Sequence, residues 1–69
     1  MYSLYFEDAY GKLHFLSKSE EKKDLMKVMH EELDKKGIKP YYIRSWEQDG
    51  VLILDYGSHS RFYRIVEED

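Results

Sequence analysis

The clearest pattern of apolar and polar residues lies in the second half of the chain, over residues 41–56. Two runs rich in aromatic and β-branched residues lie there on either side of an Asp-Gly pair at 49–50. Asp-Gly accepts positive φ at both central positions of a type I′ turn, so this pattern predicts a hairpin with a two-residue loop. The predicted cross-strand pairs on one face are Gln48–Val51, Trp46–Ile53, Arg44–Asp55 and Tyr42–Gly57.

Near the start of the chain, core-type apolar residues alternate with other residues, and this pattern predicts another hairpin from residues 2–6 and 12–16. Its link, residues 8–11, ends in Gly11, which suits a type I turn closed at positive φ. A four-residue loop places the apolar side chains Leu4, Phe6, Leu13 and Phe15 on one face, directed at the core. The expected pairs are Glu7–Lys12, Phe6–Leu13, Tyr5–His14 and Leu4–Phe15.

Between the two hairpins, apolar residues recur at helical spacing and predict a helix over residues 18–36. Ser17 followed by Glu20 has the spacing of a capping box, and Ser19 is an alternative N-cap. Gly37 suits the left-handed position that follows a helix in a Schellman motif. The apolar stripe of this helix consists of Leu25, Met26, Val28, Met29 and Leu33.

A last strand, over residues 61–66, completes the order β-β-α-β-β-β in a chain of 69 residues. This order predicts an α+β fold, an antiparallel sheet of about five strands with one helix packed on one face. The length allows a single domain over residues 1–69. We expect its acidic end, residues 67–69, to be frayed.

Composition narrows the class of protein without indicating an activity. The chain has no cysteine and a net charge of −3. The lack of cysteine excludes disulfides and thiolate metal sites, and so mild a charge does not indicate a polyanion binder. The sequence contains neither a long apolar run nor a leader-like segment, so we expect no membrane span and a cytoplasmic protein.

Catalytic or metal-binding chemistry has little support in the pattern. The histidines His14, His30 and His59 lie on a predicted strand, helix and loop and show no metal-ligand spacing. Asp55, Ser58 and His59 are more simply explained as turn residues than as a catalytic set. We therefore predict a non-enzymatic protein with no cofactor, no metal site and no small-molecule ligand.

One face of the predicted C-terminal sheet is too apolar to stay exposed when the helix covers the other face. Exposed apolar patches are typical of interfaces, and Trp, Tyr and Arg dominate interface energetics. The leading interpretation is that this face binds a protein, with a homodimer as the expected form. The other interpretation is that the N-terminal hairpin folds over it as a second layer. The predicted contact residues are Tyr42, Trp46, Ile53, Phe62 and Arg64.

A nucleic-acid-binding module is the alternative function, because arginines and stacking rings interleave on the same strands. Arg44, Arg61 and Arg64 would carry the binding. Residues 41–66 hold as many carboxylates as arginines, so this part of the chain has no net charge to attract phosphates. The balance of charge favours a protein partner over nucleic acid.

The aromatic and turn residues of residues 41–64 form a recognisable pattern. It consists of Tyr42-Ile43-Arg44-Ser45-Trp46, Asp49-Gly50-Val51, Asp55-Tyr56-Gly57-Ser58-His59 and Phe62-Tyr63. This pattern resembles short uncharacterised proteins encoded by phages and prophages of Gram-positive bacteria. The resemblance implies a phage or prophage origin and a bacterial cytoplasm, and it implies no activity. Small phage proteins often bind a host protein, which by analogy agrees with a contact surface for a host or phage protein.

Overall fold

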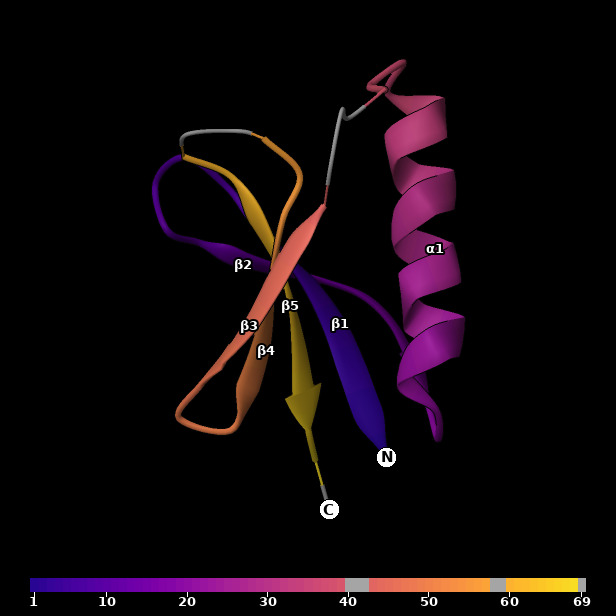
Figure 1. Cartoon of the computed structure of the whole chain (residues 1–69), viewed down its shortest axis with the longest axis vertical. Coiled ribbons are helices and arrows are strands. Elements are labelled where there is room, and N and C mark those ends of the chain that lie inside the picture. Colours follow the sequence, from indigo (N-terminus) through magenta and orange to yellow (C-terminus); the bar gives the residue numbers. More distant parts are fainter. Residues whose placement is uncertain (40–42, 58–59, 69) are drawn as a thin grey trace.

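The computed structural model shows one five-stranded antiparallel sheet with a helix on one face, and it describes residues 1–39, 43–57 and 60–68 (Figure 1). The predicted α+β fold and the predicted order of elements are confirmed. The elements are β1 (Tyr2–Glu7), β2 (Leu13–Ser19), α1 (Lys22–Lys35), β3 (Arg44–Gln48), β4 (Val51–Asp55) and β5 (Phe62–Glu67). Within the sheet the strands follow the order β2-β1-β5-β4-β3.

The first strand and the last strand hold the sheet together, because β1 pairs with β5 over its whole length. The N-terminal hairpin therefore extends the sheet sideways. The interpretation in which this hairpin folds over the apolar face as a second layer is wrong. Figure 1 shows α1 on one side of the sheet, where its backbone lies closest to β1, β2 and β5. At the start of the helix, Nζ of Lys22 lies 3.4 Å from Oε1 of Glu47 on β3.

The β3–β4 hairpin has the predicted turn and the predicted register. Asp49 and Gly50 have φ angles of 52° and 79°, as a type I′ turn requires. The observed pairs run without a shift from Gln48–Val51 beside the turn to Arg44–Asp55 at the far end. The prediction is confirmed up to this pair, and Tyr42 of the next predicted pair lies outside the described residues.

The β1–β2 hairpin differs from the prediction by one residue in register. The backbone N–H of Asp8 donates to the carbonyl of Lys12, and that of Gly11 donates to the carbonyl of Asp8, both at 3.0 Å. These bonds define a three-residue loop, a type I turn followed by a G1 bulge, with Gly11 at a φ of 81°. Since a shift of one residue exchanges the two faces of a strand, the predicted core positions of Leu13 and Phe15 are wrong. The observed pairs are Glu7–Leu13, Phe6–His14 and Tyr5–Phe15.

The side chain of Asp8 accounts for the shorter loop. Its Oδ1 accepts the backbone N–H groups of Tyr10 at 2.9 Å and Lys12 at 3.0 Å. Its Oδ2 lies 2.8 Å from Nε2 of His14, which donates to the carboxylate. The bond from His14 and the two backbone bonds hold the pKa of Asp8 below its ordinary value of 3.8. One carboxylate therefore closes the loop and sets the pairing of the strands that follow.

The helix begins later than predicted, because β2 continues to Ser19. Ser17 is paired with β1 in the sheet, so the predicted capping box at this residue is wrong. The hydroxyl of Ser19 accepts the backbone N–H of Glu21 at 3.2 Å and donates to the carboxylate of Asp24 at 2.9 Å. Ser19 thus connects the end of β2 to the first turn of the helix by hydrogen bonds, but the N-cap residue is Glu21.

The C-terminal end of α1 is the predicted Schellman motif. Gly37 has a φ of 70°, and its N–H donates to the carbonyl of Asp34 at 3.0 Å. The N–H of Ile38 donates to the carbonyl of Leu33 at 2.9 Å. These two bonds are the pair that defines the motif, and they satisfy carbonyls at the end of the helix.

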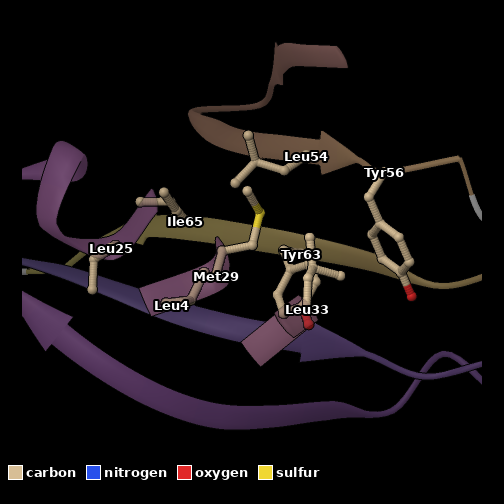
Figure 2. Packing of buried hydrophobic residues seen from close by; sticks show 8 residues of the cluster. All are labelled: Leu4, Leu25, Met29, Leu33, Leu54, Tyr56, Tyr63 and Ile65. Atoms are coloured by element: carbon tan, nitrogen blue, oxygen red, sulfur yellow. The ribbon is translucent and has the colours of Figure 1, made fainter. Parts of the chain in front are cut away.

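The hydrophobic core lies between α1 and the sheet, and Figure 2 shows its side chains meeting from the helix and the strands. Three residues of the predicted helical stripe are buried, while Met26 and Val28 pack against the core from its margin. The stripe is therefore confirmed as the core-facing side of the helix. The buried cluster is Leu4, Leu25, Met29, Leu33, Leu54, Tyr56, Tyr63 and Ile65.

One end of the core is aromatic. The ring of Tyr63 lies 5.3 Å from that of Phe6 and 5.5 Å from that of Tyr56, between centroids. The ammonium group of Lys36 sits 3.9 Å from the centroid of Phe6 and adds a cation–π contact. The hydroxyl of Tyr63 is buried and has no hydrogen-bond partner among the described residues. Burial raises the pKa of Tyr63 to about 12.

Candidate interaction surface

The side of the sheet that faces away from α1, termed here the open face, is the candidate interaction surface. The strand registers place its residues in rows that run across the sheet. The central row is Phe15–Tyr5–Arg64–Ile53–Trp46, and it crosses all five strands. One flanking row is Lys18–Ser3–Val66–Val51–Gln48, and the other contains Leu13–Glu7–Phe62 and Asp55–Arg44.

The half of the open face formed by β3, β4 and β5 is covered by two rings. The centroids of Trp46 on β3 and Phe62 on β5 are 6.4 Å apart in an edge arrangement. Strands two positions apart in a sheet are about 9.6 Å apart, so both rings lean inward over β4. This arrangement explains why Ile53 on β4 is only 4% exposed although no helix covers this side. Trp46 itself remains 39% exposed.

The other half of the open face, on β1 and β2, carries the more exposed apolar side chains. Phe15 is 56% exposed and Leu13 is 45% exposed. The ring of Tyr5 meets that of Phe15 edge-on, with centroids 5.8 Å apart. The hydroxyl of Tyr5 donates to the carboxylate of Glu68 at 2.8 Å, and this bond raises the pKa of Tyr5. The apolar surface is therefore wider than the C-terminal strands alone.

Sequence reasoning missed Leu13 and Phe15 as surface residues, because the predicted loop was one residue too long. A signal for the shorter loop exists in the run from Asp8 to Gly11. Asp at the first position and Gly three residues later suit a type I turn with a G1 bulge, in which the loop has three residues. The Asp-x-x-Gly pattern therefore indicates the three-residue loop, and with it the strand register in which these two side chains are exposed.

Two ion pairs lie among the rings of the open face. Nε of Arg64 donates to Oε1 of Glu7 at 2.8 Å, and this pair sits near the middle of the face. Nη2 of Arg44 donates to Oδ2 of Asp55 at 3.0 Å, as the hairpin register predicted. Oδ1 of Asp55 also accepts the backbone N–H of Gly57 at 2.8 Å. Each arginine of the face is therefore matched by a carboxylate of the same face.

The structure brings together four of the five predicted contact residues. Trp46, Ile53, Phe62 and Arg64 all lie on the open face, while Tyr42 lies outside the described residues. Ile53 is buried under its neighbours, Phe62 and Arg64 are half-buried, and Trp46 is the exposed member of this set.

The predicted nucleic-acid set is divided by the structure. Arg44 and Arg64 lie on the open face, and both are in ion pairs. Arg61 is exposed just before β5 and outside the rows of the face. Arg44 and Arg64 are thus already matched by carboxylates, which lowers the attraction that this face can exert on phosphates.

Residues considered for catalysis or metal binding do not converge on a site. His14 contacts Asp8 in the loop between β1 and β2, and His30 is exposed on α1. Asp55 binds Arg44, while residues 58 and 59 lie outside the described part. In the described ranges, no three His, Cys, Asp or Glu side chains are grouped so that they could hold a metal ion.

Among the described residues, no helix combines the length and the apolar character that crossing a membrane requires. Comparison with protein-family models, with curated proteins and with solved structures gives no match for this chain.

Proposed function

We propose that the chain is a small non-enzymatic protein that acts through protein–protein contacts made by the open face, and that it self-associates. The observation that carries the proposal is that exposed apolar side chains lie at both edges of a face that no second layer of described residues covers, on β2 and on β3. Trp46, Leu13 and Phe15 are three of the most exposed large apolar residues in the described chain. Exposed apolar patches of this kind mark interaction sites.

The electrostatics of the open face favour a protein partner. Arg64 and Arg44 are matched within the face by Glu7 and Asp55. A face without a strong net charge can approach an apolar protein surface, or a second copy of itself, without large repulsion. The proposal includes an origin in a phage or prophage and a place in the bacterial cytoplasm, which rest on the sequence resemblance alone.

Light scattering on a sizing column, over a range of concentrations and at two salt concentrations, tests the self-association. We expect a mass near twice 8.4 kDa that persists in high salt, because an apolar contact is not screened. A strict monomer at the highest concentration would contradict self-association. Tight binding to single-stranded oligonucleotides that weakens steeply with salt would favour the nucleic-acid alternative.

A matched pair of variants tests whether Trp46 takes part in the association. Trp46→Ala removes a 39% exposed ring from the open face, whereas Tyr10→Ala removes a 97% exposed ring from the loop between β1 and β2. We expect Trp46→Ala to weaken association at least about tenfold, in the range of an interface hot spot, and Tyr10→Ala to leave it unchanged. Equal effects of the two variants would argue against the open face.

A further inference from the structure

The outer edge of β3 is a second surface with a defined chemistry. β3 is the last strand of the sheet, with β4 on one side and no strand of the described chain on the other. All five residues from Arg44 to Gln48 are exposed, and their register with β4 contains no bulge. A regular edge strand offers unpaired backbone N–H and C=O groups to another strand.

The register identifies which backbone groups face outward. A two-residue loop places a hydrogen-bonded pair directly beside the turn, here Gln48 and Val51. Bonded and non-bonded pairs then alternate along the hairpin. The N–H and C=O groups of Ser45 and Glu47 therefore point away from β4. These two residues lie symmetrically on either side of Trp46.

The opposite edge of the sheet is less suited to pairing. β2 has an extra residue, Leu16, between the positions that pair with Tyr5 and Leu4. Such a bulge twists an edge strand and interrupts its row of backbone groups. Lys18 adds a charge on the same strand, and β2 also contacts α1. Of the two edges, only that of β3 combines full exposure with a regular backbone.

We propose that two copies of the chain pair through the outer edges of β3, antiparallel, with Trp46 on the two-fold axis. In this register Ser45 of each copy faces Glu47 of the other, and their outward N–H and C=O groups meet. Arg44 of each copy faces Gln48, so no like charges are opposed. Sliding one step in one direction places the Glu47 side chains of the two copies opposite each other. This arrangement is repulsive, although Nζ of Lys22, 3.4 Å from Oε1 of Glu47 in the same chain, offsets part of the repulsion.

Slippage in the other direction is disfavoured for a different reason. It would place Ile43 of one copy opposite Glu47 of the other, an apolar side chain against a charge. The charge pattern of this short strand therefore selects one register for a second copy of itself. The same reasoning distinguishes a second copy from an arbitrary extended segment, which would not match the symmetry of Ser45 and Glu47.

Edge pairing also enlarges the open face. A two-fold axis perpendicular to the sheet keeps both open faces on the same side, so pairing doubles this surface. The edge proposal itself does not require that the open face binds anything.

Amide hydrogen exchange, resolved by residue with NMR at several concentrations, tests the pairing directly. We expect exchange at Ser45 and Glu47 to be about tenfold slower when nine tenths of the chains are paired, since only the unpaired fraction exchanges. A dimer made through the open face alone leaves these two amides unprotected. Rates that do not change with concentration would overturn the edge proposal.

Two variants separate edge pairing from association through the open face. Ser45→Pro removes an outward N–H and no bond to β4, a position where edge strands tolerate proline. Phe15→Ala truncates an open-face ring on β2, at the far side of the sheet. We expect Ser45→Pro to abolish the edge dimer and Phe15→Ala to preserve it. The reverse result overturns edge pairing and supports the open face as the self-association site.

Circular dichroism establishes whether Ser45→Pro keeps the fold. If this variant unfolds, the exchange measurement on the unaltered chain decides alone. A chain that stays monomeric at every concentration contradicts the edge proposal as well.

Discussion

The two faces of the sheet are built from the same five strands and differ in what stabilises them. The helix face is covered by α1, and its residues Leu4 and Leu54 are completely buried. The open face is covered by its own side chains, in which Trp46 and Phe62 lean over Ile53 and two ion pairs fill the space between rings. One face therefore provides most of the folding free energy, while the other keeps apolar surface accessible for a partner.

This difference explains why the two arginines of the open face, Arg44 and Arg64, occur in ion pairs. The side chains of Arg64 and Glu7 are 30% and 17% exposed. At this degree of burial, an unpaired charge would lower the stability of the fold. These charges are already paired before a partner binds. Burying the open face in a complex would therefore leave neither of the two charges without its partner.

The strongest test of the comparison uses the same truncation on both faces. Leu54→Ala removes a fully buried side chain from the helix face, and Leu13→Ala removes a 45% exposed one from the open face. We expect Leu54→Ala to lower the free energy of unfolding by about 2–5 kcal/mol, because it leaves a cavity. For Leu13→Ala we expect less than about 1 kcal/mol. Chemical denaturation measures both, and equal losses would refute the distinction between the faces.

Asp55 is a buried charged residue of the open face. Its side chain is 9% exposed and accepts hydrogen bonds from Arg44 and from the backbone of Gly57. Asp55→Ala leaves the Gly57 N–H without this acceptor, so we expect a loss of about 1–3 kcal/mol. Arg44→Ala should cost less than about 1 kcal/mol, since the arginine side chain is 66% exposed. Denaturation curves of the two variants give the comparison, and a larger loss for Arg44→Ala would contradict it.

Tyr63 is a core residue whose substitution we expect not to lower the free energy of unfolding. Its hydroxyl is buried without a partner among the described residues, so the folded state bears the cost of removing it from water. We expect Tyr63→Phe to be neutral or to raise the free energy of unfolding by up to about 1 kcal/mol. Thermal or chemical denaturation decides the sign. A clear loss of stability would show that the hydroxyl has an acceptor.

The smallest expected effect concerns the loop that holds Leu13 and Phe15 on the open face. The pKa of Asp8 is lowered in the folded chain, mainly by the bond from His14. A lowered pKa stabilises the fold above the unfolded value, and this contribution is lost as the pH falls through the folded value. Asp8→Asn keeps an acceptor for the loop and removes the titration. We expect the variant to show a weaker loss of stability below pH 3.8 than the original chain.

Denaturation curves at several acidic pH values measure this difference. The control is Asp34→Asn, an exposed carboxylate on α1 away from the loop. It should retain the acid dependence of the original chain. Identical acid dependence in Asp8→Asn and in the original chain would contradict the role of Asp8.

Sequence and structure agree best where a feature depends on neighbouring residues. The Asp49-Gly50 turn defines the pairing of Trp46 with Ile53 and of Arg44 with Asp55 without help from the rest of the chain. Gly37 likewise ends the helix through bonds to the preceding turn. On the candidate surface, this local reasoning placed Trp46, Ile53, Phe62 and Arg64 on one face.

The first hairpin shows where such reasoning becomes ambiguous. Loops of three and four residues both fit the run from Asp8 to Gly11, and they place Leu13 and Phe15 on opposite faces. The side-chain bonds of Asp8 select the shorter loop. The start of the helix was equally ambiguous, because Ser17 and Ser19 suit both a cap and a strand end.

By itself the sequence determined the fold class, the β3–β4 register, the core-facing side of α1 and the helix end, since turn and cap conformations depend on a few adjacent residues. Only the tertiary structure decided that β1 lies beside β5 and that the N-terminal hairpin extends the sheet. It also exposed Leu13 and Phe15, and it placed β3 at an edge where no other strand of the described chain pairs with it. These features depend on contacts between segments that are distant in the sequence. The entropy lost in bringing such segments together, and the contacts that offset it, are not evident from the pattern of neighbouring residues.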